Sequence, residues 1–162
     1  MTERLEVRTS TKYALPPAPE PLPVPTTDAH THALSTRDHS GLAVADALAL
    51  ARSVNVTRIV EVGTDVASST AAIELAGQYP DVVAAVAIPP NDAARLGDRL
   101  PVELDRLAAL VGSSDRVRAV GETGLDYFRT TDPDGQARQK EASAAPIAWA
   151  KEHDLARVIH HR

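Results

Sequence analysis

Short runs of apolar residues alternate along the chain with longer stretches of helical character. Such runs, rich in β-branched residues, are typical of strands that are buried on both faces, as in parallel sheets. A more polar segment, VPTTDAHTH, opens the series near residue 26. The other four predicted strands are VTRIVEVGT (56–64), DVVAAVAIPP (81–90), RVRAVGETG (116–124) and LARVIHH (155–161).

The stretches between these runs have the composition and end signals of helices. Asp65 and Ser68 are suited to cap one helix, and Pro146 predicts a kink or a break in another. We expect Trp149 to face the core from that last helix. The predicted helices cover residues 42–54, 65–79, 100–112 and 135–154.

Five predicted strands therefore alternate with four predicted helices, at intervals that suit βαβ units of about 30 residues. This order predicts an α/β fold with a parallel sheet. Residues 14–27, ALPPAPEPLPVPTT, hold six prolines and favour an extended conformation over a helix. We expect residues 1–24 to form a Pro-rich N-terminal arm and residues 25–162 to form the folded domain.

Composition narrows the possible functions. Hydrophobic residues make up 43% of the 162 residues and charged residues 24%, which are ordinary values for a globular protein. The net charge of −5 argues against a basic, non-specific nucleic-acid coat protein, but not against a metal-dependent enzyme that acts on phosphates. Aromatic residues are only 3% of the chain, so composition predicts no base-stacking surface.

Cysteine is absent, so any metal ion must be bound by nitrogen and oxygen atoms. No apolar run reaches the roughly 18 residues of a membrane span, and the first 25 residues lack the apolar segment of a secretory signal. We therefore expect a cytoplasmic protein with no membrane partner.

Side chains that bind metals or phosphates follow three of the five predicted strands. In a β/α barrel, the groups that carry out the chemistry lie where the strands meet the following loops. Successive side chains of a strand point to opposite faces, so Asp28, His30 and His32 on the first strand share one face. The candidates are Asp28, His30 and His32 on the first strand, Glu122 and Asp126 on the fourth, and His160, His161 and Arg162 on the fifth.

This pattern favours metal-assisted hydrolysis. Neutral imidazoles and a carboxylate can fix one or two divalent ions, with Glu122 as a bridge between them. One ion would lower the pKa of a bound water, and the other would stabilise the leaving oxygen. Arg162 is suited to hold a phosphate oxygen. Asp126 is a candidate to orient its loop instead of binding metal.

Four motifs, DAHTH, VGT, AVGETGLDYFR and VIHHR, resemble the TatD family of metal-dependent deoxyribonucleases in order and spacing. The resemblance implies a (β/α)₈ TIM-type barrel that hydrolyses DNA phosphodiester bonds at a site with two divalent ions, Mg²⁺, Mn²⁺ or Zn²⁺. It implies that His30, His32, Glu122 and His160 are metal ligands, with Glu122 also catalytic, and that Arg162 contacts the substrate.

The chain departs from the family pattern at three points. Pro89 replaces a histidine expected after the third strand, and His161 separates His160 from Arg162. Two further metal ligands of the family lie beyond the fifth strand, and a complete barrel needs about 250 residues. We therefore expect an incomplete barrel of about five β/α units, truncated after strand five, with impaired activity and with self-association through its two open sheet edges.

Two alternatives remain open. The HxH pattern is shared by other barrel metallohydrolases that cleave amides, lactones or other phosphoesters, although GETGLDY favours the nuclease. A truncated, non-catalytic remnant is the second alternative. His39 and His153 have the neighbours of surface histidines, and we expect neither to act in the site.

Overall fold

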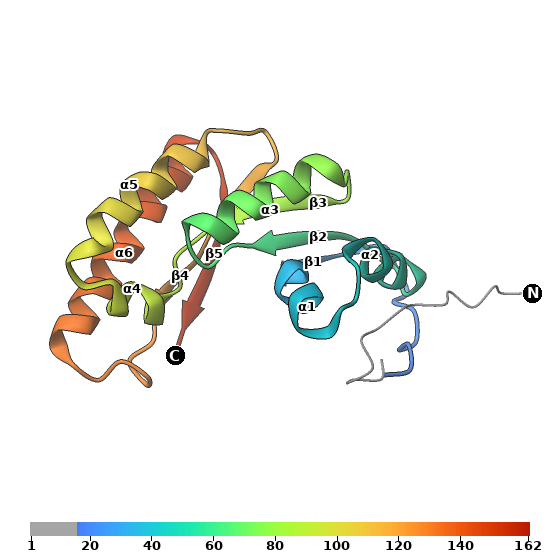
Figure 1. Cartoon of the computed structure of the whole chain (residues 1–162), viewed down its shortest axis with the longest axis horizontal. Coiled ribbons are helices and arrows are strands. Elements are labelled where there is room, and N and C mark those ends of the chain that lie inside the picture. Colours follow the sequence, from blue (N-terminus) through green and yellow to red (C-terminus); the bar gives the residue numbers. More distant parts are fainter. Residues whose placement is uncertain (1–15) are drawn as a thin grey trace, which may run out of the picture. The chain divides into compact units, whose positions relative to one another are not determined.

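A computed structural model describes residues 16–162 (Figure 1). It contains two compact units: one ends at Ile59, and the other runs from Val60 to Arg162. The first 15 residues of the predicted N-terminal arm lie outside the described residues. Across residues 16–162, no helix combines the length and the apolar character that crossing a membrane requires.

Five strands form the sheet, and their order in the sheet follows their order in the chain. The pairs β3–β4 and β4–β5 are parallel. The predicted α/β fold with five parallel strands and intervening helices is therefore confirmed. The strands are β1 (Thr26–Thr31), β2 (Val56–Val62), β3 (Val82–Val86), β4 (Val117–Leu125) and β5 (Ala156–His161).

All four predicted helices are present, and two more helices appear that the sequence pattern did not predict. The additional ones, α1 and α4, have eight and seven residues, too few for a clear apolar stripe to develop. The helices are α1 (Ala33–Ser40), α2 (Val44–Ser53), α3 (Val66–Gln78), α4 (Pro90–Leu96), α5 (Leu100–Val111) and α6 (Pro133–Glu152), with a 3₁₀ turn, η1 (Gly97–Arg99), before α5.

The predicted cap at Asp65 is a complete capping box. Its Oδ1 atom accepts a hydrogen bond from the Ser68 backbone N–H at 2.7 Å, and the Ser68 Oγ atom accepts one from the Asp65 backbone N–H at 3.0 Å. Two N–H groups that the first turn of a helix leaves without partners are thereby satisfied.

Helix α6 continues through Pro146, so the expected break does not occur. Proline has no N–H to donate to the carbonyl four residues earlier, which belongs to Ala142. The Thr123 hydroxyl from β4 approaches that carbonyl oxygen at 3.5 Å and supplies a replacement donor. The strand beneath the helix thus compensates for the proline.

The larger unit packs its helices against one face of the strands (Figure 1). Val86 and Val120 from the sheet meet Leu100 and Leu107 from α5, all of them almost completely buried. Trp149 packs against this cluster, as predicted. On the other face of the strands lies a small cluster, Val62, Ala85, Ala87 and Ala119.

In the smaller unit, the described end of the Pro-rich segment is tied to the turn that precedes β2. The Leu22 backbone N–H donates to the Val54 carbonyl at 3.1 Å, and the Asn55 side chain donates to the Leu22 carbonyl. The Thr26 N–H donates to the Asn55 carbonyl at 2.8 Å. These bonds fix where β1 begins.

The backbones of β4 and β5 approach closely at the two glycines that flank Glu122. Gly121 and Gly124 have φ angles of 110° and 144°, which L side chains rarely adopt. A Cβ atom at Gly124 would overlap the His160 carbonyl oxygen, and one at Gly121 would overlap that of Val158. The register of the two strands shifts between Val120 and Thr123, at a bulge.

Replacing Gly124 with alanine is expected to lower the free energy of unfolding by about 2 kcal/mol or more, because both the backbone angle and the contact with β5 oppose a side chain. Gly77→Ala is the matched control. A Cβ atom at Gly77 meets no atom within 4 Å, so that variant should be about 0.5–1 kcal/mol more stable than the wild type. Urea unfolding measures both, and equal stabilities would contradict the close approach.

Candidate functional site

His30 and His32 lie at the carboxyl end of β1, where the structure brings their rings together. The strand ends at Thr31, so His32 is the residue that precedes α1 and not the last residue of the strand. Their Nε2 atoms are 3.3 Å apart, and the rings meet edge to face with centroids 5.0 Å apart. Asp28, expected on the same face, accepts a hydrogen bond from the His30 backbone N–H at 3.1 Å.

This separation suits a shared metal ion. Two nitrogens that bind one ion at about 2.0–2.1 Å with tetrahedral angles are about 3.3–3.4 Å apart. The donor set is also appropriate, because neutral imidazoles are common ligands of Zn²⁺ and other divalent ions. The histidine pair therefore fits the kind of metal that the sequence predicts.

A second group of predicted residues meets at the carboxyl ends of β4 and β5 in the larger unit. The Nδ1 atom of His160 lies 2.6 Å from Glu122 Oε1, and its Nε2 atom lies 3.3 Å from Asp126 Oδ2. Both nitrogens of the imidazole thus face carboxylate oxygens. The parallel register that pairs Gly124 with His160 produces this contact.

Asp126 is the most deeply buried of these groups, with a fully covered side chain. Burial alone would raise the pKa of its carboxyl group. Hydrogen bonds from the Asn91 side chain, the Arg129 backbone N–H and His160, together with the charge of Arg129, outweigh burial and hold the pKa below the ordinary value of 3.8. The group is therefore ionised at neutral pH and can only accept hydrogen bonds.

His160 lies between two hydrogen-bond acceptors. The contact of 2.6 Å between Nδ1 and Glu122 Oε1 and the contact of 3.3 Å between Nε2 and Asp126 Oδ2 each require a hydrogen on the ring nitrogen when the carboxylate is ionised. A metal ion bound at Nδ1 would replace the hydrogen on that side, and the hydrogen on Nε2 would stay with Asp126. Metal-binding histidines are commonly fixed in this way by a carboxylate on their second nitrogen.

A chain of buried amide and hydroxyl groups supports Asp126. The Asn91 Nδ2 atom donates to Asp126 Oδ2 at 2.9 Å, and Thr130 Oγ1 donates to Asn91 Oδ1 at 3.2 Å. Gln139 Nε2 donates to Thr130 Oγ1 at 2.8 Å, while Gln139 Oε1 accepts from the Asp126 backbone N–H at 2.8 Å. The side-chain donors of Gln139, Thr130 and Asn91 follow one another toward the Asp126 carboxylate, and the Asp126 backbone N–H donates back to Gln139.

A cavity of about 240 Å³ opens beside these residues. Two of the predicted ligands, Glu122 and His160, line it, and Pro89 stands in its wall as the first residue before α4. Arg95 and Arg129 contribute positive charge. The remaining lining residues are Pro90, Asn91 and Asp92.

Arg162 lies at the end of β5, with its guanidinium carbon 4.1 Å from the centroid of the Phe128 ring. Two backbone hydrogen bonds hold it there: its N–H donates to the Leu125 carbonyl at 3.0 Å, and its carbonyl accepts from the Tyr127 N–H at 3.1 Å. The predicted contact with a phosphate remains compatible with this position, because a guanidinium group can stack through its face and donate through its edge.

The predicted ligands thus occur as two pairs, His30 with His32 and Glu122 with His160. Among residues 16–162, no group of three or more His, Asp or Glu side chains is spaced to hold a metal ion. His39 is exposed on α1 and bonds the Ser35 carbonyl, in agreement with its predicted surface role.

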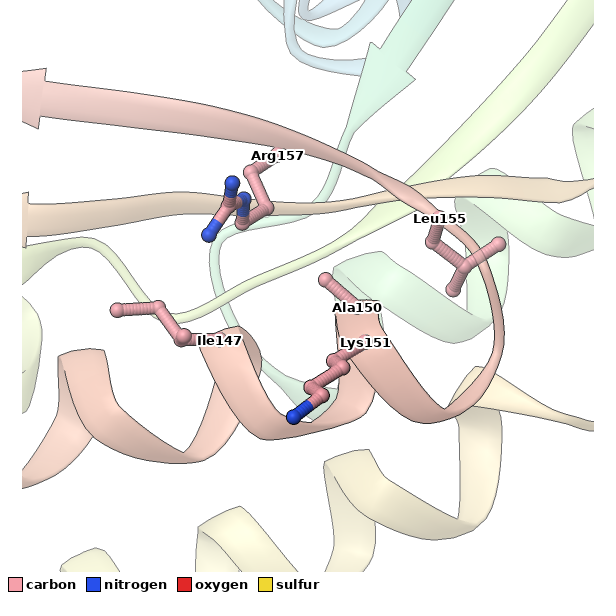
Figure 2. Close-up of a pocket in the computed structure, with 5 residues that line it drawn as sticks. All are labelled: Ile147, Ala150, Lys151, Leu155 and Arg157. Atoms are coloured by element: carbon pink, nitrogen blue, oxygen red, sulfur yellow. The ribbon is translucent and has the colours of Figure 1, made fainter.

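Another cavity, of about 340 Å³, lies between α6 and the start of β5. Figure 2 shows Ile147, Ala150 and Lys151 on the helix, Leu155 just before β5 and Arg157 on the strand itself. None of these side chains is a carboxylate or an imidazole, so this cavity has no groups for the expected chemistry.

Sequence reasoning missed the residues that support the site. Gln139 lies within a polar stretch, QARQKE, where burial has no visible signal. Asn91 follows two prolines in a helix that was not predicted, and Arg129 follows GETGLDYF without a pattern of its own. A polar residue inside a helix is noticeable only when its burial is known.

A parallel β/α sheet with histidines and carboxylates at the carboxyl ends of its strands is the arrangement of metal-dependent hydrolases of the barrel class. The chain belongs to the family of TatD-related DNases, whose sequence profile matches residues 27–162. The resemblance seen in the sequence motifs is thereby confirmed.

Two relatives illustrate the match. A protein from Mycobacterium tuberculosis, named as an uncharacterized metal-dependent hydrolase TatD, is 36% identical over 83% of this chain and 51% of its own length. A protein from Dickeya dadantii, named 3'-5' ssDNA/RNA exonuclease TatD, is 34% identical over 71% of this chain and 42% of its own length. The chain spans about half the length of these relatives.

A solved structure agrees with the fold. The crystal structure of YJJV, a TatD homologue from Escherichia coli K12, superposes with a TM-score of 0.67 at 26% identity, covering 84% of this chain and 50% of that one. The five β/α units therefore correspond to part of a TatD-type barrel, as predicted.

Gln139→Leu is expected to lower the free energy of unfolding by about 2 kcal/mol or more, because it leaves the buried Asp126 N–H without its acceptor and removes the hydrogen bond that the Thr130 hydroxyl accepts. Gln78→Leu, at the exposed end of α3, is the matched control and should change stability by no more than about 0.5 kcal/mol. Urea unfolding compares them. A Gln139→Leu protein as stable as the control would contradict the supporting role of this network.

Proposed function

We propose that this chain is a TatD-type metal-dependent hydrolase that cleaves DNA phosphodiester bonds with a metal-activated water. The observation that carries the proposal is the arrangement of His160, which is held by Asp126 on one nitrogen and faces Glu122 with the other. This is the geometry of a histidine prepared to bind a metal ion beside a carboxylate ligand.

His30, His32, Glu122 and His160 are the proposed ligands, for one or two ions of Mg²⁺, Mn²⁺ or Zn²⁺. The histidine pair supplies two nitrogens at the separation that one ion requires. The bound ions would lower the pKa of a water molecule and stabilise the leaving oxygen. Glu122 would bridge or orient, while Asp126 fixes the ring of His160.

The positive charges around the cavity support a phosphate substrate. Arg95 and Arg129 line it, and both side chains are more than half exposed. Each guanidinium group forms an ion pair with a carboxylate. The Nη1 atom of Arg95 lies 3.0 Å from Asp92 Oδ1, and that of Arg129 lies 3.8 Å from Asp126 Oδ2. Guanidinium groups held in this way are pre-oriented to bind phosphate oxygens. The exonuclease name of the Dickeya relative agrees with a nucleic-acid substrate.

We also propose that turnover by this chain is low. Pro89 occupies the cavity wall where the family pattern predicts a histidine, and proline offers no side-chain proton donor or acceptor. We further propose a cytoplasmic location, a division into an arm (1–24) and a partial barrel (25–162), and self-association through the sheet edges. β1 and β5 stand at the two ends of the strand order, and Ile159 on β5 is 59% exposed.

DNA cleavage in the presence of Mn²⁺ or Mg²⁺ tests the proposed function. Cleavage of a single-stranded oligonucleotide should cease on addition of EDTA and fall by about 100-fold or more in His32→Ala and in Glu122→Gln, because each variant removes a proposed ligand. His39→Ala is the control and should retain wild-type activity, because His39 is exposed on α1 and bonds only within that helix. The proposal fails if no ion supports cleavage, or if His32→Ala cleaves as well as the control. Hydrolysis of a lactone or an amide in place of DNA would favour another barrel metallohydrolase.

Asp126→Asn is expected to weaken Zn²⁺ binding by about 10- to 100-fold, because the neutral amide no longer fixes the His160 ring by accepting from Nε2–H as a carboxylate does. Isothermal titration of the purified chain measures this affinity. Asp98→Asn, at an exposed position in η1, is the control and should bind Zn²⁺ as the wild type does. Equal affinities for all three proteins would show that Asp126 has no part in preparing the site.

A further inference from the structure

We propose that the ring of Phe128, backed by the Arg162 guanidinium, is a stacking subsite for one unpaired nucleobase of a single-stranded nucleic acid. The inference rests on the proposed function in one respect, because it places the neighbouring phosphate in the cavity that Glu122 and His160 line. It adds a base-binding element that the low aromatic content of the sequence argued against.

Phe128 is the only phenylalanine in the chain, and it is 69% exposed. A large aromatic ring on the surface loses the stabilisation that burial would give it. The Arg162 guanidinium lies over the ring, 4.1 Å from its centroid. Such a cation–π contact covers one face of the ring and leaves the other available for a flat partner.

The ring is held on a well-anchored turn. Asp126 Oδ1 accepts from the Arg129 backbone N–H at 3.0 Å, and the Asp126 carbonyl accepts from the Thr130 N–H at 3.1 Å. On the other side, the backbone of Tyr127 bonds that of Arg162 at 3.1 Å. A subsite on an anchored turn loses little conformational entropy when a ligand binds.

The turn also connects the ring to the cavity. Arg129, the residue that follows Phe128, lines the cavity together with Glu122 and His160. A phosphate held by Arg129 would therefore have its nucleoside beside Phe128. The same carboxylate, Asp126, holds both this turn and the His160 ring.

Charge favours a nucleobase over a purely apolar partner. The Arg162 guanidinium lies over the ring, and the residue that follows Phe128 in sequence, Arg129, carries a second positive charge. A hydrophobic protein partner would have to desolvate both charges, whereas a nucleic acid brings phosphates that pair with them. Every base has a π face, so a stacking contact of this kind tolerates any sequence but requires a base that is not paired in a duplex.

The test compares two oligonucleotides with the same number of phosphates, oligo(dT) and an abasic analogue, on the full chain in EDTA. Stacking of one base should make oligo(dT) bind about 5- to 100-fold more tightly than the abasic oligomer. Because the chain contains a single phenylalanine, isotope labelling of that residue type isolates the Phe128 ring in NMR spectra. Its resonances should shift with oligo(dT) and stay in place with the abasic oligomer.

Three variants sharpen the comparison. Phe128→Leu should bring the affinity ratio close to one while its affinity for the abasic oligomer stays within about twofold of the wild type. Phe128→Trp should preserve the ratio, because indole also stacks. Val102→Ala removes another exposed apolar side chain, on α5, and should leave the ratio unchanged.

The subsite is refuted if the wild type binds the two oligomers equally or binds neither, if the Phe128 resonances do not respond to oligo(dT), or if Phe128→Leu keeps the ratio. Neither metal nor cleavage enters these measurements, so their failure is distinct from a failure of the proposed function. A base-dependent affinity ratio without any DNA cleavage would overturn only the proposed function. Cleavage without such a ratio would overturn only the stacking subsite.

Discussion

The buried carboxylate of Asp126 joins four parts of the larger unit. It accepts hydrogen bonds from Asn91 in α4, from the backbone of Arg129 in the following turn, and from His160 in β5. Through its own backbone N–H it is also bound to Gln139 in α6. An ionised group at full burial is stable only with such compensation, so its partners cannot be removed one at a time without cost. The orientation of His160 and the position of the turn that carries Phe128 both depend on this one group.

A second constraint, the close approach of two backbones, brings the Glu122 carboxylate within reach of β5. Gly121 and Gly124 let the backbones of β4 and β5 approach closely on either side of Glu122. The bulge between Val120 and Thr123 shifts the register there. As a result, the Oε1 atom of Glu122 on β4 lies 2.6 Å from the Nδ1 atom of His160 on β5. The glycines of GETGLDY are therefore required by the packing of two strands, and the acidic residues between and after them supply the chemistry.

Most of the fold could be predicted from the sequence, because apolar runs and helix caps are local signals. The five strands were predicted to within a few residues, and the cap at Asp65 was identified from two residue types. Of the kink or break predicted at Pro146, the break was wrong, because the compensating donor, Thr123, comes from a strand more than twenty residues earlier. The short helices α1 and α4 were missed because their length leaves no periodicity to detect.

In the candidate site, too, residues with a local sequence signal were predictable and residues placed by tertiary packing were not. The histidines and Glu122 could be named as candidates because they lie at the ends of predicted strands in a recognisable order. The stacking of Arg162 on Phe128 and the burial of Gln139 arise only from tertiary packing, so no local pattern indicates them. Low aromatic content predicts no base-stacking surface, and the subsite proposed at Phe128 would be an exception to this prediction, because composition counts rings without showing where one of them is placed.

The tautomer of His160 tests the central claim most directly, because it reports what Asp126 does to this ring. Nitrogen-15 NMR of the imidazole resonances, assigned with a His160→Gln variant, distinguishes the two ring nitrogens. The account predicts that the Nδ1 resonance moves when Zn²⁺ is added and that Nε2 carries the hydrogen in the Zn²⁺-bound protein. A ring that keeps its only hydrogen on Nδ1 in the presence of Zn²⁺, or one whose Nδ1 resonance does not respond to Zn²⁺, would contradict the role assigned to Asp126 and the proposed metal site.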